Sequence, residues 1–273
     1  MSIKIENTRV SNWETAIRDT RKLMNSLEES DSAFFGGEVI KWAEWYKKKK
    51  AWAEEPFPKP YHDDENGGCR IGDVLIGPND HKFLMNLCKG GTEKAKWRCM
   101  VHVKMDVTAP LYWWEEFETY KVGTVSFLDS ENADEDCWMH KIHAKEFTLD
   151  DFSCEHLVDC PDSGECEPYT VSYDCEGNDE YFYPMDSMRM TVSMLNAARK
   201  SYLRAKAEKK YWWQMIQLLP SSYNQKRTID LNYEVLASQY RQRKDHKLDE
   251  WREYCDWIRS LPYSEFITME ETK

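Results

Sequence analysis

The sequence feature that most constrains the fold is an unbroken alternation of apolar and polar residues from Trp97 to Val107, "WRCMVHVKMDV". Successive side chains of a β-strand point to opposite faces of the sheet, so this alternation predicts a strand with one buried face. We expect Cys99 and Val103 on the buried face and His102 on the other. Such a strand must pair with further strands and bury its apolar face against helices.

Apolar residues at helical spacing predict helices on both sides of this strand. The predicted helices cover residues 12–30, 37–55, 78–91, 187–220, 231–244 and 248–261. Asn79 or Asp80 would cap the third helix and Asp230 the fifth, because short polar side chains accept hydrogen bonds from the first free N–H groups. Pro220 would end the fourth helix. Helices around at least one central strand indicate the α+β class.

Composition and charge exclude several classes of protein. The chain of 273 residues has no apolar run of about 18 residues, so we expect no membrane span. Its start lacks a signal-peptide core, which favours the cytoplasm. The net charge of −12 argues against general nucleic-acid binding, because phosphate contacts need basic residues. We expect one α+β domain over residues 1–273, with a helical N-terminal part over 1–68 and an acidic Cys-rich insertion over about 129–180.

The chain has nine cysteines, which raises the question of disulfides or metal. A cluster in the insertion combines four of them with a histidine: Cys154, His156, Cys160, Cys166 and Cys175. Zinc ligands usually come in CxxC-type pairs, and this cluster has none, so we expect reduced thiols and no metal. A zinc-bearing interaction protein stays the weaker alternative. Just before the cluster, Thr148 and Asp151 have the spacing of a capping box.

The segment "PLYWWEEFETYKVGT" follows the strand and admits two interpretations. Pro110 can open a helix, which would place Tyr112, Glu116 and Thr119 or Tyr120 along one side, with Lys121 beside them. The aromatic rings would then be core and the charges a solvated edge, which composition favours. Alternatively, the carboxylate, hydroxyl and cation would form the wall of a site. No P-loop, GxGxxG, HExxH or GxSxG motif is present, and no residue stands out as a nucleophile.

Several motifs, in this order along the chain, resemble those of the flavin-dependent thymidylate synthases, especially divergent phage-type members. The segment "PLYWWEEFETYKVGT" fits the family's P-R-x-x-x-R-Q-x-x-R-H-R frame and the serine after it, with Glu116 at the glutamine, "TYK" at R-H-R and Thr124 at the serine. Upstream, "GGTEKAKW" is similar to G-H-x-S-x-x-E-H and keeps Glu93. Downstream, "DLNYEVLASQYRQRK" is similar to the N-L-R and L-R motifs, with Asn232 and Arg243 at family positions.

The resemblance implies a central antiparallel sheet flanked by helices, in a homotetramer with shared active sites. It implies reductive methylation of dUMP or a related pyrimidine deoxynucleotide in dTMP biosynthesis, with FAD as cofactor and NADPH and methylenetetrahydrofolate as co-substrates. The implied substrate-binding residues are Glu116, Tyr120, Arg243 and Ser130. The implied cofactor-binding residues are Lys121, Thr124, Asn232 and Glu93.

The roles follow from the same resemblance. Glu116 would hydrogen-bond the base or sugar, Lys121 and Arg243 would meet phosphate, and Tyr120 or Trp114 would stack on a ring. No protein nucleophile is implied.

Basic residues of the family frame are replaced in this chain. "TYK" stands at R-H-R, and Glu234 stands at the arginine of N-L-R. Arginine forks match phosphate oxygens in a bidentate way, so losing several should weaken binding of both FAD and dUMP. Two hypotheses follow: an enzyme of flavin-dependent nucleotide methylation, or an inactive protein of the same fold that binds a nucleotide or serves in assembly.

Overall fold

The computed structural model describes residues 3–34, 40–41, 68–69, 74–128, 141–159, 169–172, 179–205 and 208–269. The chain divides into two compact units. The first contains Met1–Lys4, Val107–Glu118 and Phe127–Arg227. The second contains Ile5–Asp106, Thr119–Ser126 and Thr228–Lys273.

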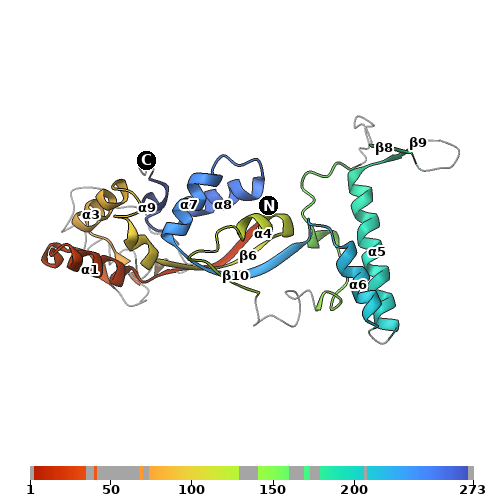
Figure 1. Ribbon diagram of the computed structural model, residues 1–273, viewed down its shortest axis with the longest axis horizontal. Helices are drawn as coiled ribbons and strands as arrows, with labels where there is room; N and C mark the ends of the chain where they lie inside the picture. Colours follow the sequence, from red (N-terminus) through yellow and green to blue (C-terminus); the bar gives the residue numbers. More distant parts are fainter. Residues whose placement is uncertain are drawn as a thin grey trace. The chain divides into compact units, whose positions relative to one another are not determined.

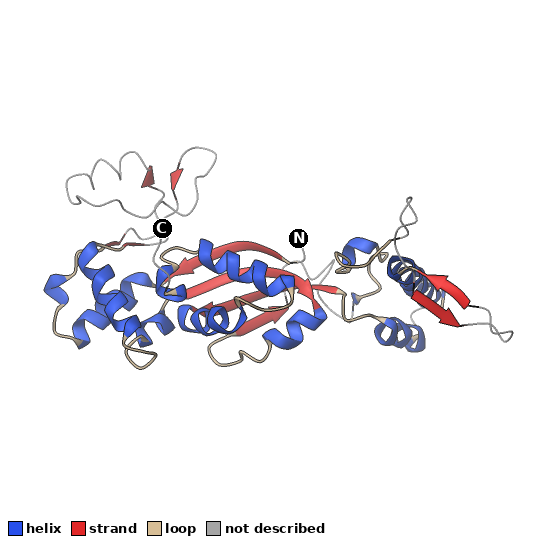
Figure 2. Ribbon diagram, turned by 90° about the horizontal axis from the view of Figure 1, so that it is seen from above, coloured by secondary structure: helices blue, strands red, loops and turns tan. Residues whose placement is uncertain are grey.

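The main sheet has four strands in the order β1-β6-β10-β7. They are β1 (Lys4–Ser11), β6 (His102–Pro110), β10 (Asn224–Asn232) and β7 (Val125–Leu128). The fold is an antiparallel sheet flanked by helices (Figures 1 and 2), which confirms the predicted class. Strands β6 and β10 supply residues to both units. The division therefore does not test whether the chain forms one domain, and the single domain stays a prediction.

Three small antiparallel pairs complete the described strands. They are β2 (Ala33–Phe34) with β5 (Val74–Leu75), β3 (Ile40–Lys41) with β4 (Gly68–Cys69), and β8 (Tyr169–Ser172) with β9 (Asp179–Phe182). The predicted helix over 37–55 is wrong at Ile40–Lys41, and most of it lies outside the described residues. The predicted helical N-terminal part also did not include β1, whose short, mostly polar sequence carries a weak strand signal.

The alternation that predicted the central strand is confirmed within β6. Val103, Met105 and Val107 are fully buried and His102 is exposed. The strand begins five residues later than predicted, because Lys96–Met100 forms the 3₁₀ helix η2. Its tight turns are closed by bonds such as Arg98 N–H to Ala95 O, 3.0 Å. The prediction that Cys99 lies on the buried face is therefore wrong, and its side chain is exposed.

Helices of the second unit surround an aromatic core. They are α1 (Trp13–Leu23), η1 (Leu27–Glu29), α3 (Pro78–Lys89), α7 (Tyr233–Arg243), α8 (Asp249–Ser260) and α9 (Glu265–Thr268). The fully buried Trp13 ring lies 5.1 Å from Tyr233, and Trp97 lies 5.1 Å from Phe266. Edge-on aromatic pairs of this kind add roughly 0.5–1.5 kcal/mol beyond the area they bury.

The caps of these helices differ from the predicted ones. Asp31, 48 residues away in sequence, accepts hydrogen bonds from the backbone N–H groups of Asn79 (2.9 Å) and Asp80 (3.1 Å). Asp230 lies inside β10, and Asn232 caps α7 by accepting from Val235 N–H at 3.0 Å. The residue types were as expected, but the sequence did not show where the preceding strand ends or that a cap can come from a distant segment.

A buried ion pair joins α1 to α3. Arg21 Nε donates to Asp80 Oδ1 at 2.7 Å, and the two side chains are 3% and 0% exposed. Ser30 and Ser32 donate to the other carboxylate oxygen at 2.7 and 2.5 Å. Burial raises the pKa of Asp80, but the hydrogen bonds from Ser32, Ser30 and Arg21 outweigh it and lower the pKa below its usual value. Asp80 is therefore held as a carboxylate.

The first unit contains α4 (Leu111–Phe117), η4 (Leu149–Asp151), α5 (Pro184–Arg204) and α6 (Lys209–Leu218). Helices α5 and α6 lie side by side (Figure 1), and Leu195 and Met215 are fully buried in the cluster between them. The predicted single helix to Pro220 is wrong, because the chain turns back after α5 so that α6 buries its apolar face against it. The capping box of Thr148 and Asp151 is confirmed.

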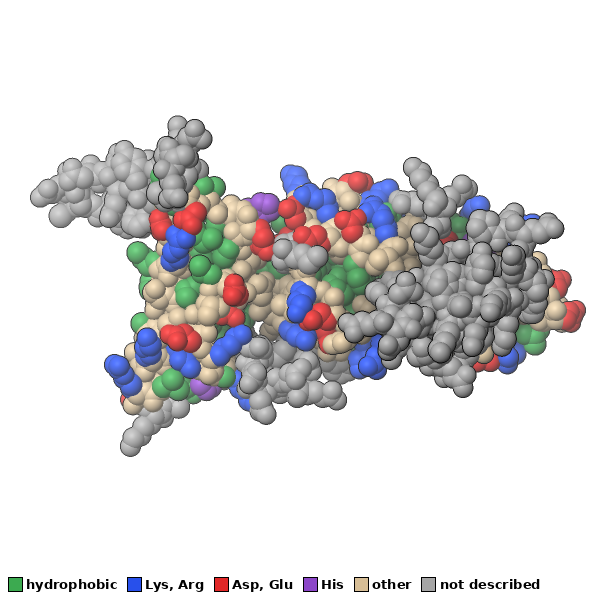
Figure 3. All heavy atoms as spheres, turned by 180° about the vertical axis from the view of Figure 1, so that it is seen from behind, with side chains coloured by type: hydrophobic (Ala, Val, Ile, Leu, Met, Phe, Trp, Pro, Cys, Tyr) green, Lys and Arg blue, Asp and Glu red, His purple; other side chains and the backbone are tan. Residues whose placement is uncertain are grey.

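Within the described residues, no helix combines the length and the low polarity needed to cross a membrane. Basic and acidic side chains are interspersed on the described part of the face in Figure 3. Of the cysteine-histidine cluster, only Cys154 and His156 lie within the described residues.

Candidate functional site

The aromatic residues of α4 belong to the core of the first unit. Trp113, Trp114 and Phe117 are 0%, 1% and 2% exposed, and the Trp113 and Phe117 rings stack with centroids 4.9 Å apart. Trp114 Nε1 donates to the Gln225 carbonyl at 2.9 Å. The core interpretation is therefore right for these rings, and Trp114 has no exposed face on which a ligand ring could stack.

The helix that carries these rings ends before the predicted site residues. Phe117 is its last residue, and the Glu118 N–H closes the final turn on Trp114 O at 2.9 Å. Tyr120 and Lys121 therefore lie beyond the helix, and the predicted alignment of Glu116 with Tyr120 along one helix face is wrong. Glu116 is half-buried and belongs to the first unit, whereas Tyr120 belongs to the second. Ser130 lies outside the described residues.

In the second unit, Tyr120 and Arg243, two of the predicted substrate-binding residues, are in contact. Arg243 Nε donates to the Tyr120 hydroxyl at 2.9 Å, and that hydroxyl donates to Gln242 Oε1 at 3.2 Å. The Arg243 guanidinium lies 4.6 Å from the centre of the Trp251 ring, and Trp251 is fully buried. A cation–π contact of a partly buried guanidinium contributes roughly 0.5–2 kcal/mol, so the guanidinium is held in a defined place.

His246 completes this group, which we call the Arg243 cluster: Tyr120, Gln242, Arg243, His246 and Trp251. Arg243 Nη1 lies 3.0 Å from His246 Nε2, and Leu248 N–H points at His246 Nδ1 from 3.2 Å. A neutral imidazole accepts at one nitrogen only, so one of these contacts is not a hydrogen bond.

A tight loop connects the Arg243 cluster to the start of α7. Gly123 has a φ of +79°, and a Cβ there would lie 3.0 Å from Asn232 Nδ2 and 3.1 Å from Val235 Cγ2. The loop thus packs against the N-terminal end of α7, while Tyr120 contacts its C-terminal end. These ends are roughly 16 Å apart at 1.5 Å per residue. The structure therefore brings the loop and α7 side by side.

The predicted residues of the loop differ in their surroundings. Lys121 is exposed and has no ion pair within the described residues. Thr124 Oγ1 is buried and has no hydrogen-bond partner in the described part of the chain. Asn232 is 8% exposed and its Oδ1 is engaged as the cap of α7. The loop thus carries an exposed cation, Lys121, and a buried hydroxyl, that of Thr124, which has no hydrogen-bond partner among the described residues.

Glu93 is the one described residue of the predicted cofactor set that is not brought to this loop. It pairs with Lys96 at 3.2 Å on the surface, and the two side chains are 86% and 73% exposed. Such exposed pairs contribute about 0–1 kcal/mol. Glu93 thus has an ordinary surface environment.

Sequence reasoning missed His246 and Trp251 as members of the site. Trp251 was expected only as part of a buried helix face, which it also is. His246 lies in the short connection between α7 and α8 and carried no motif. The pocket of the second unit, in turn, is lined by none of the predicted site residues.

Comparison with known proteins identifies the fold. No protein-family model matches this sequence, and no curated protein matches it. Among solved structures, thymidylate synthase X from Helicobacter pylori with FAD and dUMP has 11% sequence identity and a TM-score of 0.54, with 98% of each chain covered. A second structure of that enzyme, also with FAD and dUMP, has 12% identity and a TM-score of 0.52, covering 98% of this chain and 99% of that one. At this identity the likeness shows a shared fold.

Proposed function

We propose that this protein binds a pyrimidine nucleotide at the Arg243 cluster. The observation that carries the proposal is the fixed guanidinium of Arg243, held by the Tyr120 hydroxyl at 2.9 Å and by the Trp251 ring. A pre-positioned arginine loses little freedom when it binds a phosphate or a base carbonyl, which favours binding. The related fold of an enzyme whose structure contains dUMP supports the same ligand class.

The substrate residues of the second unit have roles in this proposal. Arg243 and the exposed Lys121 would meet the phosphate, and the half-buried Tyr120 ring would contact the base. The hydrogen bond expected from Glu116, in the first unit, to the base or sugar stays a prediction, as does the substrate contact of Ser130, which lies outside the described residues. A homotetramer remains the expected assembly, and light scattering on the purified protein would measure it.

The residues at the predicted flavin positions fit FAD poorly. Its pyrophosphate needs cations or free N–H groups, but the first turn of α7 presents the Glu234 carboxylate, 2.6 Å from Arg98 Nη2. The Asn232 side chain already caps that turn, and Lys121 is the one cation of the loop.

Nucleotide binding is tested by thermal shift and calorimetry with dUMP, UMP and dTMP. A ligand at a hundred times its Kd should stabilise the protein by about 2.7 kcal/mol. We expect Arg243→Gln to abolish the shift. Arg18→Gln, an equal change of charge at an exposed position of α1 outside both the Arg243 cluster and the pocket of the second unit, is the matched control and should keep it. A shift that survives Arg243→Gln, or disappears with Arg18→Gln, would contradict this location.

The second candidate function is reductive methylation of the bound nucleotide, and the shared fold favours it. When bound, FAD would supply the hydride, with NADPH and methylenetetrahydrofolate as co-substrates. The test is flavin absorbance of the protein as isolated, followed by dUMP-dependent oxidation of NADPH. If the protein is colourless and stays inert after FAD is added, yet binds the nucleotide, the proposal of methylation is contradicted and the proposal of nucleotide binding is kept.

A further inference from the structure

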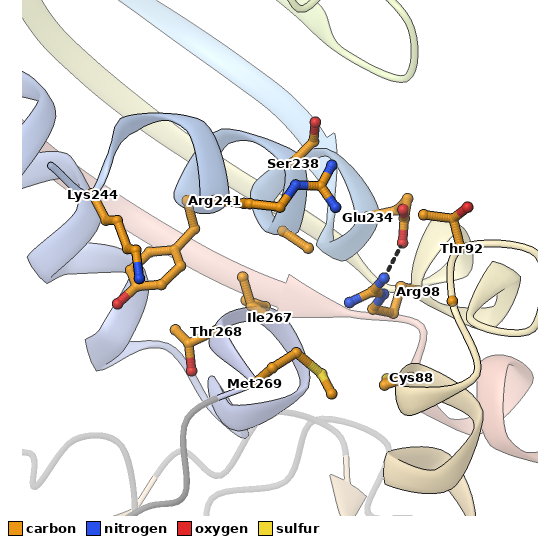
Figure 4. Close-up of a pocket in the computed structure, with 13 residues that line it drawn as sticks. Cys88, Thr92, Arg98, Glu234, Ser238, Arg241, Lys244, Ile267, Thr268 and Met269 are labelled. Carbon is orange, nitrogen blue, oxygen red and sulfur yellow. Dashed lines mark ion pairs between the residues drawn. The ribbon is translucent and has the colours of Figure 1, made fainter. Parts of the chain in front are cut away.

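The second unit contains a pocket of about 250 Å³ on a different side of α7. Figure 4 shows residues from the end of α3, the turn after it, η2, α7 and α9 pointing around one hollow. The members that matter for its chemistry are Thr92, Arg98, Glu234, Ser238, Arg241 and Lys244. Drug-sized ligands occupy about 300–1,000 Å³, so this pocket suits a smaller molecule.

The charges of the pocket do not cancel. Arg98 Nη2 lies 2.6 Å from Glu234 Oε2, in side chains that are 7% and 24% exposed, so this pair is neutral overall. Arg241 and Lys244 are exposed at the rim, and neither forms an ion pair or a side-chain hydrogen bond within the described residues. Two positive charges therefore have no acidic partner among the described residues, in a chain whose net charge is −12.

The partial negative charge at the C-terminal end of α7 is too small to balance both Arg241 and Lys244. The C-terminal end of a helix carries about −0.5 of an elementary charge, and α7 ends at Arg243. One cation more than offsets that partial charge. The two cations together still leave a positive potential in the pocket, which favours an anion.

Hydrogen-bond donors line the same hollow. Ser238, Thr92 and Thr268 supply hydroxyl groups. Arg98 Nε is buried and has no hydrogen-bond partner among the described residues. Between the polar groups, Ala237 and Ile267 supply an apolar wall. The pocket thus combines two cations and several donors with a small apolar surface.

We infer that this pocket binds a small phosphate monoester, whose dianionic phosphate is held by the rim cations Arg241 and Lys244 and whose organic part lies against Ala237 and Ile267. Two cations match the charge of a phosphate dianion, whereas a carboxylate would neutralise only one. At 100° per residue, Arg241 and Lys244 lie about 160° and 100° around the helix from Arg243. The site is therefore separate from the Arg243 cluster and does not rest on the proposed function.

Calorimetry on the full chain with phenyl phosphate and with inorganic phosphate tests this inference. We expect phenyl phosphate to bind more tightly than inorganic phosphate, because only the ester reaches the apolar wall. Arg241→Gln and Lys244→Gln should each weaken binding about tenfold, as expected for the loss of one charge-assisted hydrogen bond. Both side chains are exposed, so the fold should persist.

Two controls make the outcome decisive. Lys247→Gln removes the same charge three residues beyond Lys244, outside the pocket, and should leave binding unchanged. Arg243→Gln should also leave it unchanged, whatever it does to nucleotide binding. The inference is overturned if neither probe binds, if Lys247→Gln weakens binding as much as Lys244→Gln, or if Arg243→Gln abolishes it.

Discussion

Tyr120 and Arg243 are 123 residues apart in the sequence and share a hydrogen bond of 2.9 Å. The bond joins a loop that has no regular structure to the last residue of α7. This hydrogen bond and the contact between the flat side of the same guanidinium and the Trp251 ring together fix the orientation of the group.

Tyr120→Phe keeps the ring and removes the hydroxyl that holds Arg243. We expect the free energy of unfolding to fall by about 0.5–1.5 kcal/mol, the usual value of one hydrogen bond. Nucleotide affinity should fall several-fold, because Arg243 would then have to be ordered on binding. Denaturant unfolding and calorimetry measure the two effects. Unchanged affinity would show that the bond does not serve the site.

Asp80→Asn should be strongly destabilising, because it removes the buried carboxylate from Arg21, whose other ion pair is with the exposed Glu29 at 3.1 Å. Removing one member of a buried pair costs about 3–5 kcal/mol. The matched control is Asp19→Asn, which breaks the exposed pair with Lys22 and should cost about 1 kcal/mol or less. Urea unfolding compares both with the parent chain. Equal effects of the two substitutions would contradict the role of burial.

The same carboxylate predicts a dependence on pH. The pKa of Asp80 is lowered in the folded state, so its contribution is fully present above the unfolded-state pKa of about 3.9. It is lost as the pH falls through the lower folded-state pKa. The stability difference between the parent chain and Asp80→Asn should therefore be constant from neutral pH down to about pH 4 and shrink below it. A difference that grows under acid would contradict this.

Cysteine reactivity should differ by position. Burial raises the pKa of Cys88 to about 11 and that of Cys255 to about 12, so both stay protonated and covered. Cys99 is exposed, although burial of part of its side chain raises its pKa as well. We expect an alkylating reagent to label Cys99 before Cys88 and Cys255, as peptide mass mapping would show. Early labelling of Cys88 would mean that the pocket wall opens.

Gly123→Ala should destabilise the loop beside α7. The φ of +79° strains any L-residue, and the new Cβ would lie 3.0 Å from Asn232 Nδ2. Gly91→Ala is a matched control, since its φ is +88° but nothing lies within 4 Å of the added Cβ. Backbone strain costs about 1–3 kcal/mol in both, and Gly123→Ala should cost more because of the contact. Denaturant unfolding of the two variants measures the difference.

The elements with strong local patterns could be predicted from the sequence. The alternation in β6 and the apolar face of α8, with Trp251, Cys255 and Ile258, are set by burial that repeats along the chain. The break between α5 and α6 could not be predicted, because both halves have helical periodicity and only their packing against each other places the turn. Asp31 as the cap of α3 depends on a contact across 48 residues, which no local pattern records.

The candidate site was predictable only in part for the same reason. The resemblance implied that Tyr120 and Arg243 both bind substrate without pairing them, and the structure places the two side chains in contact. It did not indicate His246, which has no motif, or the pocket on the other side of α7. That pocket arises where four separate segments of the chain meet, and each of its residues taken alone has an ordinary local sequence.

The contact between Arg98 and Glu234 also constrains how this chain can evolve. Replacing either residue alone leaves a largely buried charge without a counterion, at a cost of about 3–5 kcal/mol, which a marginally stable protein rarely tolerates. The two positions should therefore change together across descendants of this sequence. A lineage that places arginine at position 234 should first have lost the guanidinium at position 98, so the order of substitutions along its history is itself constrained.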